Sequence, residues 1–122
     1  MKTTTLYGLH KCSTCVKAMA WLDEHRKPYT FIDYRDHPIA APQLLIWSRE
    51  LGGWEKLVNR ASMTWRNLSD DRKAPKSDAQ WFALVAEFPA LVRRPVMVGV
   101  EGMVSVGFSD KKYGQLFGDL SI

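Results

Sequence analysis

The chain has 122 residues, with 17 Lys and Arg against 13 Asp and Glu, a formal net charge of +4, and 46% hydrophobic residues. These values predict one domain with a single core and exclude a disordered chain, and two cysteines are too few for a disulfide-stapled secreted scaffold. The positive charges are scattered, which favours small anions or acidic peptides as partners at least as much as nucleic acid.

The first third of the chain has the pattern of a strand, a helix and a second strand. Residues 3–7 predict a buried strand that ends at Gly8, and a helix is expected over about residues 13–26. Residues 29–34 are aromatic and β-branched, as in a strand. A helix between two strands predicts a βαβ unit with parallel strands. The expected apolar face of the helix consists of Cys15, Met19 and Leu22, with Val16 beside them.

The middle of the chain predicts a set of helices. Four of the tryptophans fit apolar helix faces or their edges, which predicts core packing, whereas Trp65 falls in a polar connection. The expected parts are a helix from Pro42 to Leu51 that ends at Gly52-Gly53, a short helical turn over residues 54–58, a polar connection over residues 60–76, and a helix that begins at the capping-box pair Ser77 and Gln80 and ends before Pro89.

The last third predicts a hairpin followed by a helix. Residues 96–100 and 103–106 have strand composition and are joined by Glu101-Gly102, a two-residue connection typical of a tight hairpin. Ser109 can cap a final helix that carries Asp110 in its first turn. The expected inner face of this helix consists of Tyr113, Leu116 and Phe117.

One motif, Cys12-Ser13-Thr14-Cys15, stands at the start of the first predicted helix. Unpaired backbone N–H groups and the helix dipole favour a thiolate there. Cys12 is nearer the loop and is the expected nucleophile, whereas Cys15 lies on the core face and is the expected resolving thiol. With this motif, the element order predicts an α/β chain of thioredoxin-like fold, one domain over residues 1–122 with a helical insertion at about residues 40–90.

Zinc is the metal alternative for a Cys-x-x-Cys pair. A structural zinc site needs four ligands, and beside this pair the chain offers only the scattered histidines His10, His25 and His37. We therefore expect no bound metal and a redox pair. His10 and Lys11 directly precede the motif, where each either stabilises a thiolate or is simply solvated.

Several residues outside the motif are candidates for binding an anionic substrate. Four arginines are candidates because a guanidinium pairs with oxyanions and carboxylates, although each is equally consistent with an ordinary charged surface residue. They are Arg60, Arg66, Arg93 and Arg94. Pro95 precedes a strand, where it either has a cis peptide bond and presents backbone to the thiolate or simply begins the strand. Ser109 and Asp110 offer a helix start with a carboxylate, suited to the α-amino and α-carboxylate groups of a substrate, or form a plain helix cap.

Short segments along nearly the whole chain resemble one known family. They are Leu6-Tyr7-Gly8, Cys12-Ser13-Thr14-Cys15 with Lys17-Ala18, Asp33-Tyr34-Arg35, Gly53-Trp54, Leu57-Val58-Asn59-Arg60, Thr64-Trp65-Arg66, Pro89, Arg94-Pro95 and Gly107-Phe108-Ser109-Asp110. On these segments the chain resembles the ArsC/Spx family of thioredoxin-fold proteins, and within it the YffB-type thiol reductases. The resemblance implies a thioredoxin fold with a helical insertion and a reactive cysteine at Cys12.

The resemblance implies different activities for different branches of the family. In arsenate-reducing members the cysteine attacks the oxyanion, glutathione or another thiol regenerates it, and three arginines hold the anion. Arg60 and Arg94 match two of these arginines, but the third falls where this chain has Gly107-Phe108. Arsenate reduction, coupled to glutathione or thioredoxin, is therefore an alternative function. Spx-type members use the CxxC as a redox switch and bind RNA polymerase, which is a second alternative.

The ending of the chain favours the YffB-type branch. Residues 107–110 are similar in placement to the loop and helix start that hold the γ-glutamyl end of glutathione in glutaredoxins. The resemblance thus implies a thiol–disulfide oxidoreductase with glutathione as co-substrate, no bound cofactor, and thioredoxin or glutaredoxin as further partners. The sequence has neither an apolar run that could span a membrane nor the apolar region of a signal peptide, so we expect no membrane contact and a cytoplasmic location.

Overall fold

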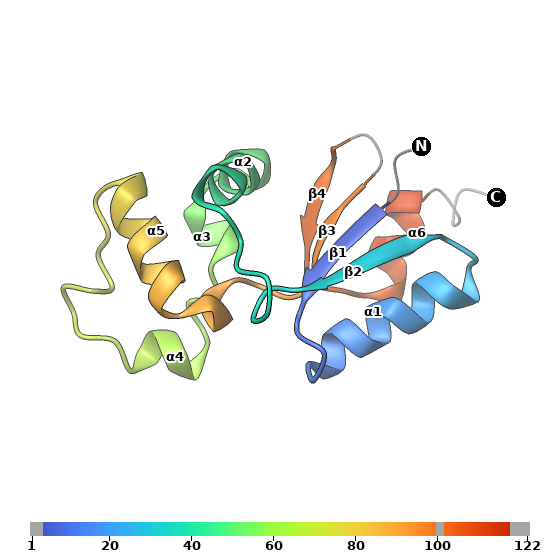
Figure 1. The fold of residues 1–122 in the computed structure, drawn as a ribbon, viewed down its shortest axis with the longest axis horizontal. Coiled ribbons are helices and arrows are strands. Elements are labelled where there is room, and N and C mark those ends of the chain that lie inside the picture. The colour runs from blue at the N-terminus through green and yellow to red at the C-terminus, as the bar shows by residue number, and fades with distance from the viewer. Residues whose placement is uncertain (1–3, 100–101, 118–122) are drawn as a thin grey trace. The chain divides into compact units, whose positions relative to one another are not determined.

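Four short strands form one mixed sheet in the computed structural model, in the order β2-β1-β3-β4. β1 (Thr4–Gly8) runs parallel to β2 (Tyr29–Asp33) and antiparallel to β3 (Val96–Val98), and β4 (Val104–Val106) pairs antiparallel with β3. α1 (Ser13–Glu24) connects the parallel strands (Figure 1), so the predicted βαβ unit is confirmed.

The structure describes residues 4–99 and 102–117, and these residues fall into two compact units. The sheet unit combines the chain up to Asp33 with the chain from Arg94 onward, and the helical unit spans Tyr34–Arg93. Within the described ranges, no helix has the length and apolar character that crossing a membrane requires.

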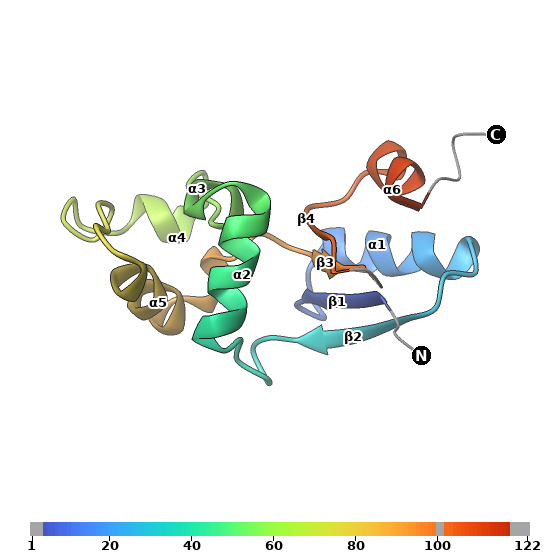
Figure 2. The same cartoon turned by 90° about the horizontal axis from the view of Figure 1, so that it is seen from above.

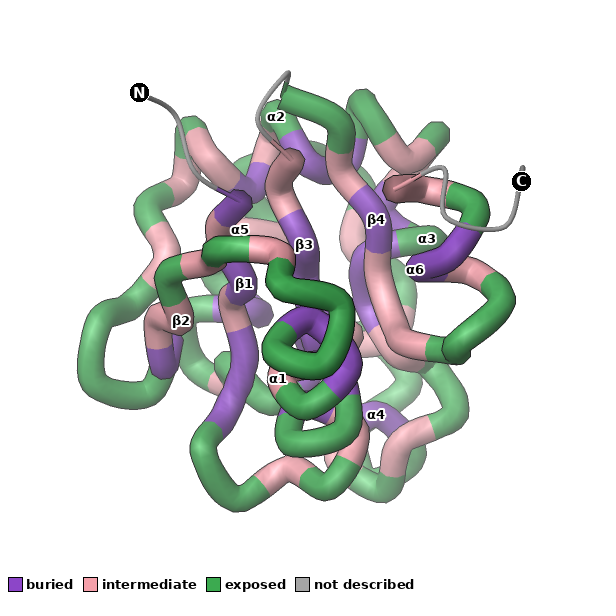
Figure 3. The backbone as a smooth tube through the Cα atoms, turned by 90° about the vertical axis from the view of Figure 1, so that its right-hand side faces the viewer, coloured by how far each residue is buried: buried purple, intermediate pink, exposed green. Residues whose placement is uncertain are grey.

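In the sheet unit, α1 and α6 (Asp110–Phe117) pack on the same face of the sheet (Figure 2). Burial follows the strand period in β1, where every second residue is buried (Figure 3). The core cluster consists of Leu6, Ala18, Trp21, Leu22, Met97 and Tyr113. A βαβ unit followed by an antiparallel hairpin and a helix is the predicted thioredoxin-like fold, which is thereby confirmed.

The helical unit contains the predicted helices, together with a one-turn helix and a 3₁₀ helix that the sequence did not indicate. Ser77 Oγ accepts from the N–H of Gln80 at 3.3 Å, as its capping-box spacing predicted, while Gln80 Oε1 accepts from the N–H of Lys76. Gly52 ends its helix at φ 98°, a conformation that favours glycine. The elements are α2 (Ala41–Leu51), α3 (Trp54–Leu57), α4 (Met63–Arg66), α5 (Asp78–Glu87) and the 3₁₀ helix η1 (Pro89–Leu91).

Residues 60–76, predicted as a connection without regular structure, contain the short helix α4, so that prediction was wrong in part. Ser62 caps it, its Oγ accepting from the N–H of Trp65 at 3.2 Å. Trp65 is buried, with its ring centroid 6.0 Å from that of Trp81, and Trp54 stacks on Trp81 at 5.6 Å. The packing of this one tryptophan gives the polar segment its helical turn.

Two further predictions differ from the structure in the sheet unit. Val16 does not lie beside the buried face of α1: its side chain is 51% exposed, because each helical step turns the side chain by about 100° and carries Val16 away from buried Cys15. In the hairpin, Val98 pairs with Val104, so the link between the strands is longer than the predicted two residues. Gly102, at φ 85°, donates its N–H to Gly99 O. The predicted strand end at residue 100 and Glu101 lie outside the described residues.

Candidate active site

Cys12 occupies the N-cap position of α1, directly after the loop that leaves β1. Its backbone is extended, with φ −83° and ψ 121°, and its carbonyl accepts the N–H of Val16 at 3.0 Å. Its own N–H donates to Leu9 O at 3.1 Å, which fixes the approach of the loop to the helix. Both cysteines are free thiols. The sulfur of Cys12 therefore lies where the first-turn N–H groups of a helix lack intrahelical partners.

The surroundings of Cys12 stabilise its thiolate. Partial burial alone raises the pKa of Cys12, but hydrogen-bond donors outweigh it and lower the pKa below the ordinary value of a thiol. These donors are the backbone N–H of Cys15, the Arg94 side chain, the Cys15 thiol and the backbone N–H of Thr14. A lowered pKa increases the fraction of the nucleophilic thiolate near neutral pH.

Cys15 has the opposite environment. It is fully buried, and burial, followed by the negative charge of Cys12, raises the pKa of Cys15 to about 11, although the Leu9 backbone acts in the other direction. Gly8, at the end of β1, packs directly on this sulfur: a Cβ at Gly8 would collide with Cys15 Sγ. The structure thus holds a half-buried thiol with a lowered pKa and, three residues later, a fully buried thiol with a raised pKa; the greater burial of Cys15 agrees with its predicted place on the core face of the helix.

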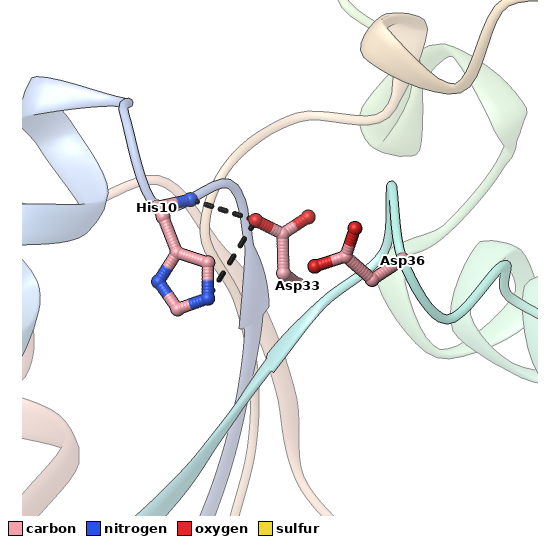
Figure 4. A group of neighbouring side chains, drawn as sticks. All are labelled: His10, Asp33 and Asp36. Carbon is pink, nitrogen blue, oxygen red and sulfur yellow. Dashed lines mark hydrogen bonds and ion pairs between the residues drawn. The ribbon is translucent and has the colours of Figure 1, made fainter.

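The loop before Cys12 is attached to the sheet by Asp33, at the end of β2. Asp33 Oδ2 accepts the backbone N–H of His10 at 3.0 Å and lies 3.8 Å from His10 Nε2 (Figure 4). The His10 ring lies against Phe31, with centroids 4.8 Å apart, and Lys11 is exposed. Together His10 and Asp33 offer two ligand atoms within the sheet unit, whereas a structural zinc site uses four.

Arg94 and Pro95 begin the return of the chain into β3. The peptide bond between them is cis, and Pro95 is fully buried, with its carbonyl accepting the N–H of Gly107 at 2.9 Å. The Arg94 side chain reaches the Cys12 sulfur as a hydrogen-bond donor. Of the four candidate arginines, Arg94 is thus the one that the structure brings to the thiol within the sheet unit.

The other predicted binding residues lie elsewhere in the two units. Ser109 caps α6, with its Oγ accepting the N–H of Lys112 at 3.0 Å, and Asp110 is exposed in the first turn of the same helix. Among the described residues, no contact joins either of them to Cys12 or Cys15. The remaining candidate arginines belong to the helical unit, where Arg60 and Arg66 are exposed and Arg93 is half-buried.

Local sequence patterns did not indicate that Asp33 and Tyr113 belong to the surroundings of the two thiols. Asp33 holds the loop only because the β1–β2 register places it opposite Gly8. Tyr113 of α6 is fully buried, and burial, followed by the charge of a Cys15 thiolate, raises its pKa. A buried helix face predicted the inward position of Tyr113, but no local signal related it to Cys15.

These observations define a protein of thioredoxin-like fold with a dithiol site at the start of α1. The sequence matches the ArsC family over residues 7–116, and the chain belongs to this family, which is of the thiol oxidoreductase type. The YffB protein is similar in structure, with 38% identity, a TM-score of 0.82 and coverage of 93% of this chain and 97% of that one. An arsenate reductase-related protein from Brucella melitensis has 35% identity, a TM-score of 0.73 and 94% coverage of both chains. The global transcriptional regulator Spx from Enterococcus faecalis is 34% identical over 87% of this chain and 80% of the regulator.

Proposed function

We propose that this chain is a thiol–disulfide oxidoreductase that uses glutathione as its reducing co-substrate, with Cys12 as the nucleophile. The observation that carries the proposal is the contrast between the two thiols. Hydrogen-bond donors lower the pKa of Cys12, whereas burial raises that of Cys15 to about 11. Near neutral pH this contrast favours attack by Cys12 and keeps Cys15 protonated until a later step.

The proposed reaction begins with attack of the Cys12 thiolate on a glutathionylated thiol. The sulfur–sulfur bond of the substrate breaks, its thiol leaves with a proton from solvent, and Cys12 is joined to glutathione. A second glutathione thiolate then attacks the glutathione sulfur of this adduct, releasing oxidised glutathione and the Cys12 thiolate. In the alternative second step, Cys15 loses its proton and attacks Cys12 sulfur, which releases reduced glutathione and leaves a Cys12–Cys15 disulfide.

Residues predicted to bind the substrate have proposed roles in holding glutathione. Arg94 offers a positive charge beside the Cys12 sulfur and would attract the carboxylates of glutathione. Pro95 would present backbone to the extended substrate, and Ser109 and Asp110 would receive its γ-glutamyl end. A reducing compartment suits this chemistry, so the cytoplasm is the proposed location. No bound cofactor or metal takes part in the proposed steps.

Intact-mass analysis tests the proposal. Reduced protein and its Cys15→Ser variant are treated with oxidised glutathione and then with excess reduced glutathione. We expect one glutathione on the variant, lost again in the second step, and none on Cys12→Ser. A wild-type protein that only closes Cys12–Cys15, together with a variant that takes up no glutathione, would exclude glutathione as the partner.

Two relatives each support a further candidate function. The similarity to the transcriptional regulator Spx favours a redox switch that acts through RNA polymerase. This switch predicts a stable Cys12–Cys15 disulfide, no turnover, and co-purification with polymerase. The arsenate reductase-related protein favours arsenate reduction, which predicts arsenate-dependent oxidation of Cys12 that requires both Arg60 and Arg94.

A further inference from the structure

The helical unit contains a pocket whose lining includes neither cysteine. Its volume is about 400 Å³, and all of its lining residues belong to the helical unit. The pocket lies between the segment that leads into α2, the first part of α2, α5 and the segment after α5. A volume of this size, with a mostly apolar lining, is typical of sites for small organic molecules.

The apolar wall of the pocket is formed by side chains that packing holds in place. Leu44 of α2 and Val85 of α5 line the pocket and are buried. The ring of Phe82 also lines it, is half-buried, and meets the ring of Trp54 edge to face, with centroids 5.5 Å apart. Trp54 is held in turn by the hydrogen bond from its Nε1 to Asp78. The wall therefore presents a fixed aromatic ring beside two aliphatic side chains.

Neither of the two polar residues in the described lining is free for a ligand. Apart from Tyr34 and Arg35, every lining residue is apolar, and none is acidic. The hydroxyl of Tyr34 donates to the carbonyl of Val92 at 3.1 Å, and Arg35 already takes part in another interaction. A charged ligand would lose its hydration here without meeting a free partner, which is costly. An uncharged apolar ligand gains free energy by leaving water for this lining.

We propose that this pocket binds a small uncharged molecule with an aromatic ring system, which packs against Leu44, Phe82 and Val85. An aromatic ligand is favoured over a saturated one of the same size, because its ring pairs with that of Phe82 in addition to burying area. Ala83 and Ala86 of α5 are exposed and line the pocket, and their short side chains leave room for a ligand to enter. The proposal does not depend on the thiol reaction, so either can fail alone.

A titration of the full ¹⁵N-labelled chain with naphthalenemethanol, followed by NMR, tests this site. We expect saturable shifts that are confined to amides of residues 34–44 and 82–92. Naphthoate and naphthylmethylammonium, substituted at the same ring carbon, add a negative or a positive charge to the same ring, and each should bind about tenfold more weakly or worse. Binding of either charged compound as tight as that of the alcohol, or shifts spread over other residues, would overturn the proposal.

The preference for an aromatic ligand is tested with the saturated alcohol decahydronaphthalenemethanol. It should bind about threefold or more weakly than naphthalenemethanol, and this preference should disappear in Phe82→Leu, which keeps an apolar side chain without the ring. Equal binding of the two alcohols to the wild type would overturn the aromatic assignment. The same preference in wild type and Phe82→Leu would overturn the pairing with Phe82.

A pair of exposed alanines tests the position of the ligand without disturbing the core. Ala86 lines the pocket, so Ala86→Leu should fill part of the space and weaken binding of naphthalenemethanol about tenfold or more. Ala79 is exposed on the same helix outside the lining, and Ala79→Leu should bind like the wild type. An unchanged affinity in Ala86→Leu, or an equal loss in both variants, would overturn the site.

Discussion

In the sheet unit, two buried hydroxyl oxygens have no hydrogen-bond partner among the described residues, whereas two buried aromatic side chains of the helical unit make hydrogen bonds through their polar atoms. Tyr113 OH and Ser105 Oγ are the two atoms in the sheet unit, and Cys15 is a fully buried thiol of the same unit. In the helical unit, Tyr34 OH donates to Val92 O and Trp54 Nε1 donates to Asp78 Oδ1. In the sheet unit, burial raises the pKa of the Cys15 thiol, whereas in the helical unit the hydrogen bonds of Tyr34 and Trp54 offset the cost of burying their polar atoms.

The largest expected effect breaks the packing of the helical unit. Trp54 stacks on Trp81 with ring planes 5° apart, and its Nε1 donates to Asp78 at 2.9 Å. Trp54→Ala should lower the free energy of unfolding by about 3–5 kcal/mol, since it removes a buried indole and leaves a cavity. Urea unfolding measures this change. Trp54→Phe keeps an aromatic ring and should cost clearly less; equal losses in both variants would contradict a main role for stacking and volume.

The second prediction concerns the packing under the buried thiol. A Cβ at Gly8 would collide with Cys15 Sγ, so Gly8→Ala should destabilise the protein by about 1–3 kcal/mol. Gly99→Ala is the matched control, because a Cβ there meets Met103 at an ordinary 3.8 Å.

A double-mutant cycle identifies the cause of the Gly8→Ala effect. In a Cys15→Ala background the obstructing sulfur is absent, and Gly8→Ala should cost at least about 0.5 kcal/mol less than in the wild type. An unchanged cost in that background would show that the strain comes from the backbone or from Phe31, which lies 3.4 Å from the same Cβ position.

Local patterns in the sequence predicted most of the fold and the positions of both thiols. Alternation and helical spacing predicted the strands and the long helices because each such element buries one face. The difference in burial between Cys12 and Cys15 followed from the same spacing. Helix α4 escaped prediction because one turn has no period; the Ser62 cap and the contact of Trp65 with Trp81 stabilise it in the structure.

Contacts between distant segments could not be predicted from the residues alone. The attachment of the His10 loop by Asp33 depends on strand register, which local patterns leave open. The approach of Gly8 to Cys15 requires coordinates for the end of β1 and the first turn of α1. Residue chemistry left Arg94 as one of four candidate arginines, and its hydrogen bond to Cys12 became visible only in the structure; binding of an anionic substrate by Arg94 stays a prediction.

The third prediction tests how Arg94 stabilises the thiolate. The hydrogen bond from Arg94 lowers the pKa of Cys12, so Arg94→Gln should raise that pKa. At pH values below the wild-type pKa of Cys12, the variant should therefore be alkylated by iodoacetamide about tenfold more slowly. At pH values above both pKa values, variant and wild type should react at similar rates. Arg93→Gln is the neighbouring control. A loss of rate that is the same at every pH would indicate a disturbed structure in place of a lost charge.

The pKa shifts of Cys12 and Cys15 have opposite signs, so the two thiols make the free energy of unfolding depend on pH in opposite ways. The folded-state pKa of Cys12 is lowered, so its contribution to stability is present at pH above the unfolded-state value and is lost as pH falls through the folded-state value. The pKa of Cys15 is raised to about 11, so its contribution is present below the unfolded-state value and is lost as pH rises toward 11. Unfolding experiments on Cys12→Ser and Cys15→Ser between pH 6 and about 10 separate the two.

The smallest expected effects compare two buried tyrosines, one from each unit. Tyr113 and Tyr34 are equally inaccessible, at 0% and 1% exposure, but only Tyr34 OH has a described hydrogen bond, to Val92 O. Tyr34→Phe should destabilise the protein by about 1 kcal/mol, because the carbonyl of Val92 loses its partner. Tyr113→Phe should stabilise it by a similar amount, because a buried donor without a partner is removed.

The rate of Cys12–Cys15 disulfide closure tests whether the Tyr113 hydroxyl takes part in the thiol reaction. If this group only fills space, Tyr113→Phe should leave the rate of Cys12–Cys15 closure unchanged while raising the free energy of unfolding. Slower closure together with higher stability would show that the hydroxyl assists deprotonation of Cys15, whose thiolate acts electrostatically on Tyr113. A lower free energy of unfolding for Tyr113→Phe would contradict the difference between the two tyrosines. It would mean that the Tyr113 hydroxyl, like that of Tyr34, has a hydrogen-bond partner in solution.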